Sequence, residues 1–268
     1  MLIDTHAHIN MIIKKSFDTL LTSSEIAKAS QIIKEAEKNG VMKLINVGTS
    51  VIESKNCILL ATTYQNVYAS VAIHPNDCTL EWQQDFNDIR HMVRNKEKNK
   101  IIAIGECGLD THYPGYSINR QIDAFKAHIE CALANNLPLI IHTRDAAEET
   151  LHVLSQYKNE KLTGIIHCFS EQMDFAQSCI DLGFVLGIGG PLTYPKNNYL
   201  RTIFASIPLN FIVLETDAPF LPPQNLRGTQ NHPKNIATIA QYLADLRGTT
   251  LSAIAHQTST NVKQIFAI

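Results

Sequence analysis

Two histidines near the start of the chain, His6 and His8, are separated by one residue and follow a short apolar run. Residues i and i+2 of a β-strand point to the same side, so a strand ending here would aim both imidazoles at one cation. An HxH pair taken alone is an incidental pattern more often than a ligand pair. It therefore indicates a metal site only where further ligand residues gather at the same place.

Further residues able to bind a metal ion follow other apolar runs. Each stands at the end of a short stretch rich in Val, Ile and Leu, and together they are His74, Glu106, His142, His167 and Asp217. Imidazole and carboxylate groups are compatible with Zn, Mn, Fe or Co, and with Mg where carboxylates and water dominate. No cysteine belongs to this set, which disfavours a structural zinc site.

These residues need a fold that brings the ends of distant strands together. The apolar runs predict eight strands, at residues 2–5, 43–47, 67–73, 101–105, 139–141, 164–166, 184–188 and 211–215. Their near-continuous apolar content is typical of parallel strands covered on both faces. Amphipathic stretches at 24–39, 117–136 and around 251–266 predict helices between and after the strands.

Eight strands alternating with helices are compatible with a barrel or with a doubly wound open sheet. The count of eight and the helix after the last strand favour an α/β fold of the (β/α)8 TIM-barrel type, as a single domain over residues 1–268. In such a barrel the carboxyl ends of all strands meet at the catalytic face. The predicted ligands, from His6 to Asp217, then form one ring. By strand alternation Arg144 follows His142 into the cleft, and Glu215 lies beneath Asp217.

Composition limits the class of function. A net charge of −2 excludes a general polycationic surface for gripping duplex DNA. It does not exclude an enzyme that takes one strand end with its metals and a few local cations. The N-terminus lacks the regions of a signal peptide, and no apolar run reaches the roughly 18 residues of a membrane span. Six cysteines without paired or zinc-ribbon spacing predict reduced thiols in a cytoplasmic protein.

Two further features allow two interpretations each. The glycines at 187–190 (GIGG) resemble a phosphate cradle, but tight turning at the end of a strand explains them about as well. His112 follows Gly108, Leu109 and Asp110, so it either reaches the cleft or remains at the surface.

Ordered motifs run through the whole chain. They are IDTHAHIN at 3–10, INVGTS at 45–50, IHPND at 73–77, IGECGLD at 104–110, LPLIIHTRDA at 137–146, IIHCFS at 165–170, GIGGPLTY at 187–194, LETDAPFLPP at 214–223, LRG at 226–228 and NHP at 231–233. With these motifs at these spacings, the chain resembles the TatD-type metal-dependent hydrolases, a deoxyribonuclease family within the amidohydrolase-like barrels.

The resemblance implies a centre of two divalent ions, Mg, Mn or Zn. The ligands implied for the first ion are His6, His8, Glu106 and Asp217. Glu106 also bridges to the second ion, whose other ligands are His142 and His167. Many binuclear amidohydrolases instead use a carboxylated lysine of strand four as the bridge. Here the nearest lysine, Lys100, stands at the start of that strand.

The resemblance also implies an activity. We expect a divalent-metal-dependent hydrolase, a deoxyribonuclease that acts on DNA or oligonucleotide ends as an exonuclease and cleaves phosphodiester bonds with a metal-activated hydroxide. The alternative is a binuclear amidohydrolase-like enzyme acting on an amide, a lactone or an aminoacyl ester. A third possibility, a non-catalytic partner-binding barrel, is disfavoured by retention of all six ligands. No membrane partner is expected, and a monomer is compatible with the sequence.

The catalytic roles follow from the chemistry of each side chain. Asp217 accepts the proton as the nucleophile forms, and Arg144 stabilises phosphate charge with its planar fork of donors. Glu215 orients a ligand or a water molecule. His74 either holds a phosphate, protonates the leaving oxygen, or is a structural histidine behind the ligands.

Three positions depart from the family pattern. Ala72 and Glu171 stand where glycine is usual, and His232 stands before Pro233 where an acid is common. All three lie outside the predicted ligand set, so they bear on the substrate rather than on metal binding.

Overall fold

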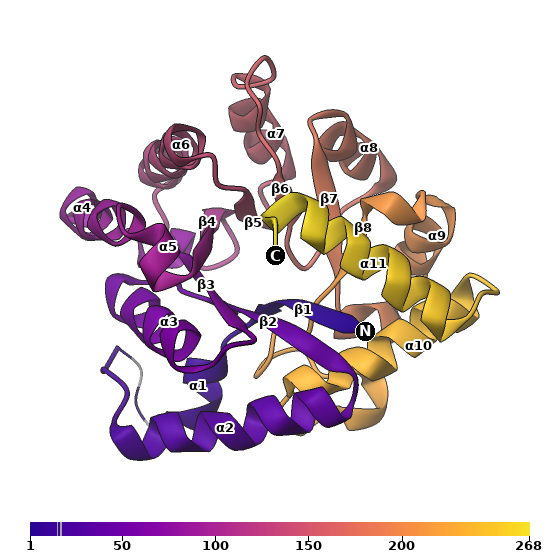
Figure 1. The fold of residues 1–268 in the computed structure, drawn as a ribbon. Coiled ribbons are helices and arrows are strands. Elements are labelled where there is room, and N and C mark those ends of the chain that lie inside the picture. Colours follow the sequence, from indigo (N-terminus) through magenta and orange to yellow (C-terminus); the bar gives the residue numbers. More distant parts are fainter. Residues whose placement is uncertain (15, 17) are drawn as a thin grey trace.

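The computed structural model describes residues 1–14, 16 and 18–268. In that part of the chain, eight parallel strands form one sheet in the order β1 to β8, with helices arranged around it (Figure 1). The predicted (β/α)8 TIM-type barrel is therefore confirmed. The strands are β1 (Leu2–Ala7), β2 (Val41–Val47), β3 (Val67–Val71), β4 (Ile101–Asp110), β5 (Leu139–Arg144), β6 (Gly164–Ile166), β7 (Phe184–Ile188) and β8 (Ile212–Leu214).

The helices lie between and after the strands. They are α1 (Ile9–Ile13), α2 (Ser23–Lys38), α3 (Val51–Thr63), α4 (Trp82–Val93), α5 (Lys96–Asn99), α6 (Ile118–Asn135), α7 (Ala147–Ser155), α8 (Met173–Asp181), α9 (Asn198–Ser206), α10 (Ile236–Leu246) and α11 (Leu251–Phe266). A capping box begins α2, because Thr22 and Glu25 each accept the other's backbone N–H. Across the described residues, no helix has both the length and the apolar character to span a bilayer.

The bounds of β3 and β4 differ from the prediction. β4 continues five residues beyond 105, because Cys107 to Asp110 stay in register with β5. Glu106 therefore lies within a strand rather than at its end. β3 ends at Val71, and His74 instead caps a short 3-10 helix, η1 (Pro75–Asp77), where its side chain accepts the N–H of Asn76.

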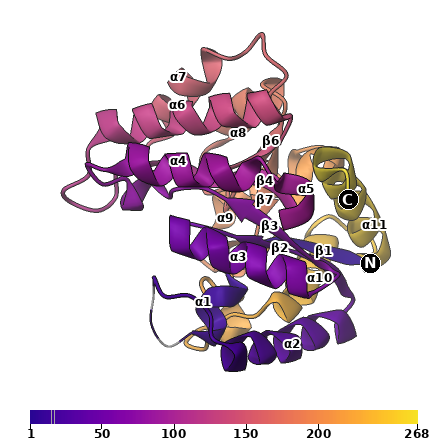
Figure 2. The same ribbon diagram turned by 60° about the vertical axis from the view of Figure 1, so that its left-hand side comes forward.

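The interior of the barrel is apolar at the end where the strands begin. Val262 and Phe266 of α11 pack against a buried cluster of strand residues, Ile3, Ile45, Val47, Ala103, Ile140, Ile165, Val185 and Val213. Figures 1 and 2 place α11 across this end of the barrel, beside the N-terminus. The predicted ligands lie at the opposite end, where the strands finish.

Side chains and loops join β8 to β1. Asp4 is fully buried and accepts hydrogen bonds from the hydroxyl of Thr216 at 2.6 Å and from its backbone N–H at 3.0 Å. The N–H of Asp217 donates to the carbonyl of His6 at 2.8 Å. This closure carries Asp217 across to the end of β1, where His6 and His8 lie.

Candidate metal centre

Four of the predicted ligands converge at the end of β1. The Nε2 atoms of His6 and His8 are 3.1 Å apart. Glu106 Oε2 lies 3.3 Å from His6 Nε2 and 3.8 Å from His8 Nε2, and Asp217 Oδ1 lies 3.9 and 3.5 Å from the same two atoms. Ligand atoms around one ion are roughly 3–4 Å apart, because each metal–ligand bond is about 2.0–2.2 Å long. The two imidazole nitrogens have that spacing from each other and from each of the two carboxylate oxygens.

The other oxygen of Glu106 faces a second group of donors. Glu106 Oε1 lies 2.8 Å from His142 Nδ1 and 3.7 Å from His167 Nε2. Glu106 is almost fully buried between the two groups, so its carboxylate offers one oxygen to each. The structure thus brings all six predicted ligands together around Glu106, and their division between two ions stays a prediction.

Contacts on the outer side of the imidazoles determine which nitrogen faces the centre. His8 Nδ1 lies 2.9 Å from the backbone carbonyl of Val47, which only accepts hydrogen bonds. Nδ1 therefore carries the proton, and the lone pair of His8 Nε2 points inward. His167 Nδ1 lies 2.9 Å from Glu215 Oε1, which is an ion-pair distance, but the two groups are not aligned for a hydrogen bond. The orienting role of Glu215 stays a prediction.

The electrostatics of the centre suit cations. Burial opposes ionisation of Glu106, but His6, His167 and His74 outweigh it and hold the pKa of Glu106 well below its ordinary value. Burial also disfavours the charged form of His167, yet the carboxylates of Glu215 and Glu106 raise its pKa to about 10. Protons thus balance the carboxylates in the metal-free chain. Divalent ions supply the same positive charge and displace those protons, so the donor set fits them.

Gly187 of β7 and Gly190, just after this strand, lie close to other residues. A Cβ on Gly187 would lie 2.3 Å from Glu215 Oε2, and one on Gly190 would lie 2.0 Å from the carbonyl of Leu221. Side chains at these positions would collide with the Glu215 carboxylate and with the loop after β8. Close packing therefore explains both glycines without a phosphate cradle.

Asp110 is a candidate functional residue that the sequence analysis did not single out. Its carboxylate is buried, and Oδ2 lies 3.0 Å from His142 Nε2 while also accepting the side-chain N–H of Asn76 at 3.0 Å. Glu106 and Asp110 are four residues apart on β4, so strand alternation places both on the same side. The alternation of residues along a longer strand would have pointed to Asp110, but the strand predicted from the sequence ends at residue 105.

Replacing Asp110 with Ala is expected to weaken metal binding by about 10- to 100-fold, because His142 loses the carboxylate that keeps its proton on Nε2 and its Nδ1 free. Asp110→Asn retains an acceptor oxygen and is expected to lose less. Calorimetric titration with Mn²⁺ or Zn²⁺ measures both variants against the parent. Unchanged affinity in Asp110→Ala would remove Asp110 from the metal centre.

His74 lies beside this centre, and Arg144 is the last residue of β5, two residues beyond His142. His74 Nε2 is 3.7 Å from Glu106 Oε1. The guanidinium carbon of Arg144 lies 5.2 Å from the centre of the Tyr113 ring, and Arg144 Nη1 is 3.4 Å from the Tyr113 hydroxyl. Arg144 is therefore held by an aromatic side chain of the loop after β4.

Among the described hydrogen bonds and ion pairs, the remaining positions considered from the sequence do not contact the six predicted ligands. His112 pairs with Asp145 at 2.7 Å, and both side chains are exposed. Ala72 is fully buried. Glu171 and His232 are half-buried, and burial raises the pKa of Glu171 and lowers that of His232. Burial, rather than the charge of any of the six predicted ligands, is the largest cause of both pKa shifts.

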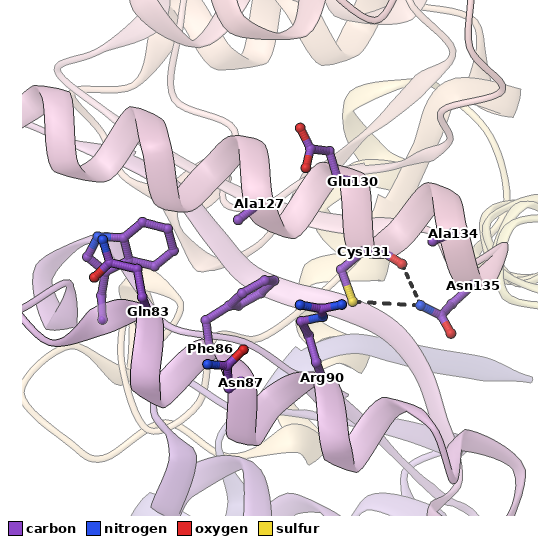
Figure 3. A pocket seen from close by; sticks show the side chains of 10 residues that line it. Gln83, Phe86, Asn87, Arg90, Ala127, Glu130, Cys131, Ala134 and Asn135 are labelled. Carbon is purple, nitrogen blue, oxygen red and sulfur yellow. Dashed lines mark hydrogen bonds between the residues drawn. The ribbon is translucent and has the colours of Figure 1, made fainter.

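A separate cavity of about 480 Å³ lies outside the barrel between α4 and α6 (Figure 3). Phe86, Arg90 and Glu130 line it, and the thiol of Cys131 accepts a hydrogen bond from the side chain of Asn135 at 3.7 Å. The six predicted ligands belong instead to β1, β4, β5 and the loops after β1, β6 and β8. This cavity is therefore not the candidate metal centre.

Comparison with known proteins agrees with this geometry. The family model for TatD-related DNases matches residues 3–267. The metal-dependent hydrolase YabD of Bacillus subtilis is 32% identical over the full length of both chains. The 3′-5′ ssDNA/RNA exonuclease TatD of Escherichia fergusonii is 33% identical, over 92% of this chain and 96% of its own. The crystal structure of YjjV, a TatD homologue from Escherichia coli, superposes with a TM-score of 0.88 at 26% identity, covering 100% of this chain and 98% of that one. The chain therefore belongs to the TatD-related DNase family of metal-dependent hydrolases.

Proposed function

We propose that the chain is an exonuclease that removes nucleotides from single-stranded DNA with two divalent ions. The observation that carries this proposal is the two-sided carboxylate of Glu106, with Oε2 towards His6 and His8 and Oε1 towards His142 and His167. The relative from Escherichia fergusonii is named a 3′-5′ ssDNA/RNA exonuclease, so we infer action from the 3′ end.

Two ions, Mg, Mn or Zn, are assigned to the two donor sets. The first set is His6, His8, Glu106 and Asp217, and the second is Glu106, His142 and His167. Divalent ions bound in such a pair lower the pKa of water and stabilise charge that develops on phosphate oxygens. The chain's own residues then bind the phosphate and move the proton.

Asp217 is assigned the role of proton acceptor. Burial opposes its ionisation, but the hydrogen bond with His8 and the charges of His167 and His6 hold the pKa of Asp217 below its ordinary value. It is therefore a carboxylate at neutral pH. Its Oδ1 faces the imidazoles, so we assign the proton to Oδ2.

His74 is assigned to hold the phosphate. Its Nδ1 accepts the backbone N–H of Asn76 at 3.1 Å, so the proton of the neutral ring is on Nε2, the nitrogen nearer Glu106. Burial, together with the charge of His142, lowers the pKa of His74 to about 3. A neutral ring donates a hydrogen bond well and a proton poorly. This favours phosphate binding over protonation of the leaving oxygen.

Arg144→Ala is expected to lower kcat/KM for oligonucleotides by roughly 10- to 100-fold, mainly through KM, since a hydrogen bond to a charged group contributes about 1.5–3 kcal/mol. Tyr113→Phe is the matched control, because it removes only the hydroxyl that Arg144 Nη1 contacts and keeps the ring beneath the guanidinium. Steady-state kinetics on a labelled oligonucleotide measure both. If KM and kcat of Arg144→Ala match the parent, Arg144 does not contact the substrate.

The function itself is tested on metal-reconstituted enzyme. The substrates are single- and double-stranded DNA and RNA labelled at either end, together with a panel of small esters, lactones and amides. A ladder that shortens from the 3′ end of single-stranded DNA is the expected result. Hydrolysis of the small substrates alone overturns the proposal and favours the amidohydrolase-like alternative.

A further inference from the structure

A large apolar side chain is exposed beside the polar donors of the metal centre. Phe220 lies in the loop after β8, three residues beyond Asp217, and 47% of it is exposed. The centre of its ring is 6.0 Å from that of His8, in a T-shaped arrangement. A T-shaped contact leaves ring surface for a stacked partner, and nothing in the metal chemistry requires an aromatic group at this position.

The backbone that presents Phe220 is fixed. The N–H of Phe220 donates to the carbonyl of Asp217 at 2.7 Å, and its carbonyl accepts the side-chain N–H of Asn231 at 2.7 Å. Asn231 is fully buried, and its side chain also donates to the carbonyl of Thr216 at 2.8 Å. The backbone that carries the exposed ring is thus ordered before any ligand arrives, which lowers the entropic cost of binding.

Phe220 is one of several large apolar side chains that are exposed. Tyr113, Tyr116 and Phe220 are aromatic residues among them that lie in loops after strands. In a parallel barrel these loops share the end at which the predicted ligands lie. The Tyr113 ring already has Arg144 over it at 5.2 Å, whereas Phe220 offers its ring directly beside a predicted ligand.

The charge of the chain indicates what this ring binds. With a net charge of −2, electrostatic attraction alone gives a nucleic acid little affinity. Proteins that bind single strands without sequence preference obtain much of their affinity from bases stacked on aromatic side chains. An aromatic ring next to a phosphodiesterase centre is placed for the base of the nucleotide being removed.

We infer that Phe220 is the stacking platform for the terminal nucleobase, the base of the nucleotide whose phosphate lies at the metal centre. The inference rests on the proposed nuclease function and names the part of the substrate that this loop recognises. Because every base has a π face, the platform accepts all four bases. It discriminates instead between a strand end that carries a base and one that lacks it.

The test compares variants of Phe220 on two probes, one of which lacks the terminal base that would stack on the Phe220 ring. The probes are a fluorescein-labelled oligodeoxynucleotide with a slowly cleaved phosphorothioate at its terminal linkage and the same oligonucleotide with an abasic terminal residue. Fluorescence anisotropy with metal-reconstituted enzyme gives Kd. Phe220→Ala is expected to raise Kd for the base-bearing probe by about tenfold or more. For the abasic probe, Phe220→Ala and the parent are expected to have the same Kd.

Conservative and distant variants serve as controls. Phe220→Trp retains an aromatic face and is expected to bind like the parent, while Phe220→Leu retains apolar bulk and is expected to bind like Phe220→Ala. Met42→Ala removes an apolar side chain of similar exposure near the start of β2 and is expected to change neither Kd. Metal content is measured for each variant, because Phe220 contacts His8.

The outcomes separate this inference from the function on which it rests. A parent enzyme that neither binds nor cleaves oligonucleotides overturns both. A parent that cleaves them, with Phe220→Ala unchanged in Kd or weakened equally for both probes, overturns the stacking platform and leaves the nuclease function standing.

Discussion

Glu106→Gln is expected to lower turnover by about a thousandfold or more, because loss of a shared metal ligand removes several kcal/mol of stabilisation. Glutamine has nearly the same shape as glutamate but presents one oxygen and one N–H2 group. In the parent, Glu106 Oε1 lies 2.8 Å from His142 and Oε2 lies 3.3 Å from His6. In Glu106→Gln, one of the two ligand sets keeps an oxygen while the other faces an N–H2 group, which cannot bind a metal ion. The barrel is expected to fold, since its apolar cluster lies at the opposite end.

The measurement combines kcat on single-stranded DNA with bound metal counted by mass spectrometry. We expect metal content to fall below two ions per chain in Glu106→Gln. Glu97→Gln is the matched control, because Glu97 is a carboxylate of α5, ahead of the start of β4, with no contact to the six donors among the described hydrogen bonds and ion pairs. Full phosphodiesterase activity of Glu106→Gln with metal present would show that Glu106 is not the bridge.

The fold and the ligand set could be predicted because each depends on a pattern repeated along the chain. Apolar runs that alternate with amphipathic stretches predict the barrel, and ligand residues at the ends of those runs predict the ring. The end of β4 could not be predicted in the same way. Its continuation to Asp110 depends on pairing with His142, Thr143 and Arg144 of β5, which lie more than 30 residues away in the sequence.

A second part of the structure was not predictable for the same reason. Glu53 of α3 is 2% exposed and forms an ion pair with Lys14, whose side chain is also buried. Glu53 Oε2 accepts hydrogen bonds from the side chains of Asn10 at 2.6 Å and Asn56 at 3.1 Å. Periodicity gives no sign of a pair 39 residues apart. The pair nevertheless fastens the segment that directly follows His8.

Glu53→Ala is expected to lower the free energy of unfolding by about 3–5 kcal/mol, because it leaves the charge of Lys14 buried without a partner. Lys14→Met combined with Glu53→Gln removes both charges and keeps an acceptor oxygen for Asn10 and Asn56, so it is expected to recover part of that loss. Urea unfolding of the metal-free chain at neutral pH measures the parent, the single variants and the double variant. A loss in the double variant equal to the sum of the losses in Lys14→Met and Glu53→Gln would mean that the ion pair contributes no coupling.

The pH dependence of the free energy of unfolding, measured for the parent and for Glu53→Gln, distinguishes the effect of the charge of Glu53 from that of its packing. Burial would raise the pKa of Glu53, but the hydrogen bonds from Lys14, Asn56 and Asn10 outweigh it and hold the pKa below its ordinary value. A carboxylate with a lowered pKa in the folded state stabilises the protein above the pKa of the unfolded chain, about 4.3, and loses that contribution as the pH falls through the folded value. The stability difference between the parent and Glu53→Gln, whose side chain is nearly isosteric, is therefore expected to be largest near neutral pH and to shrink below about pH 4. A difference that stays constant from pH 7 down to the acid transition would assign the effect to packing and hydrogen-bond geometry, and the ion pair would not be what holds α1 against α3 beside the metal centre.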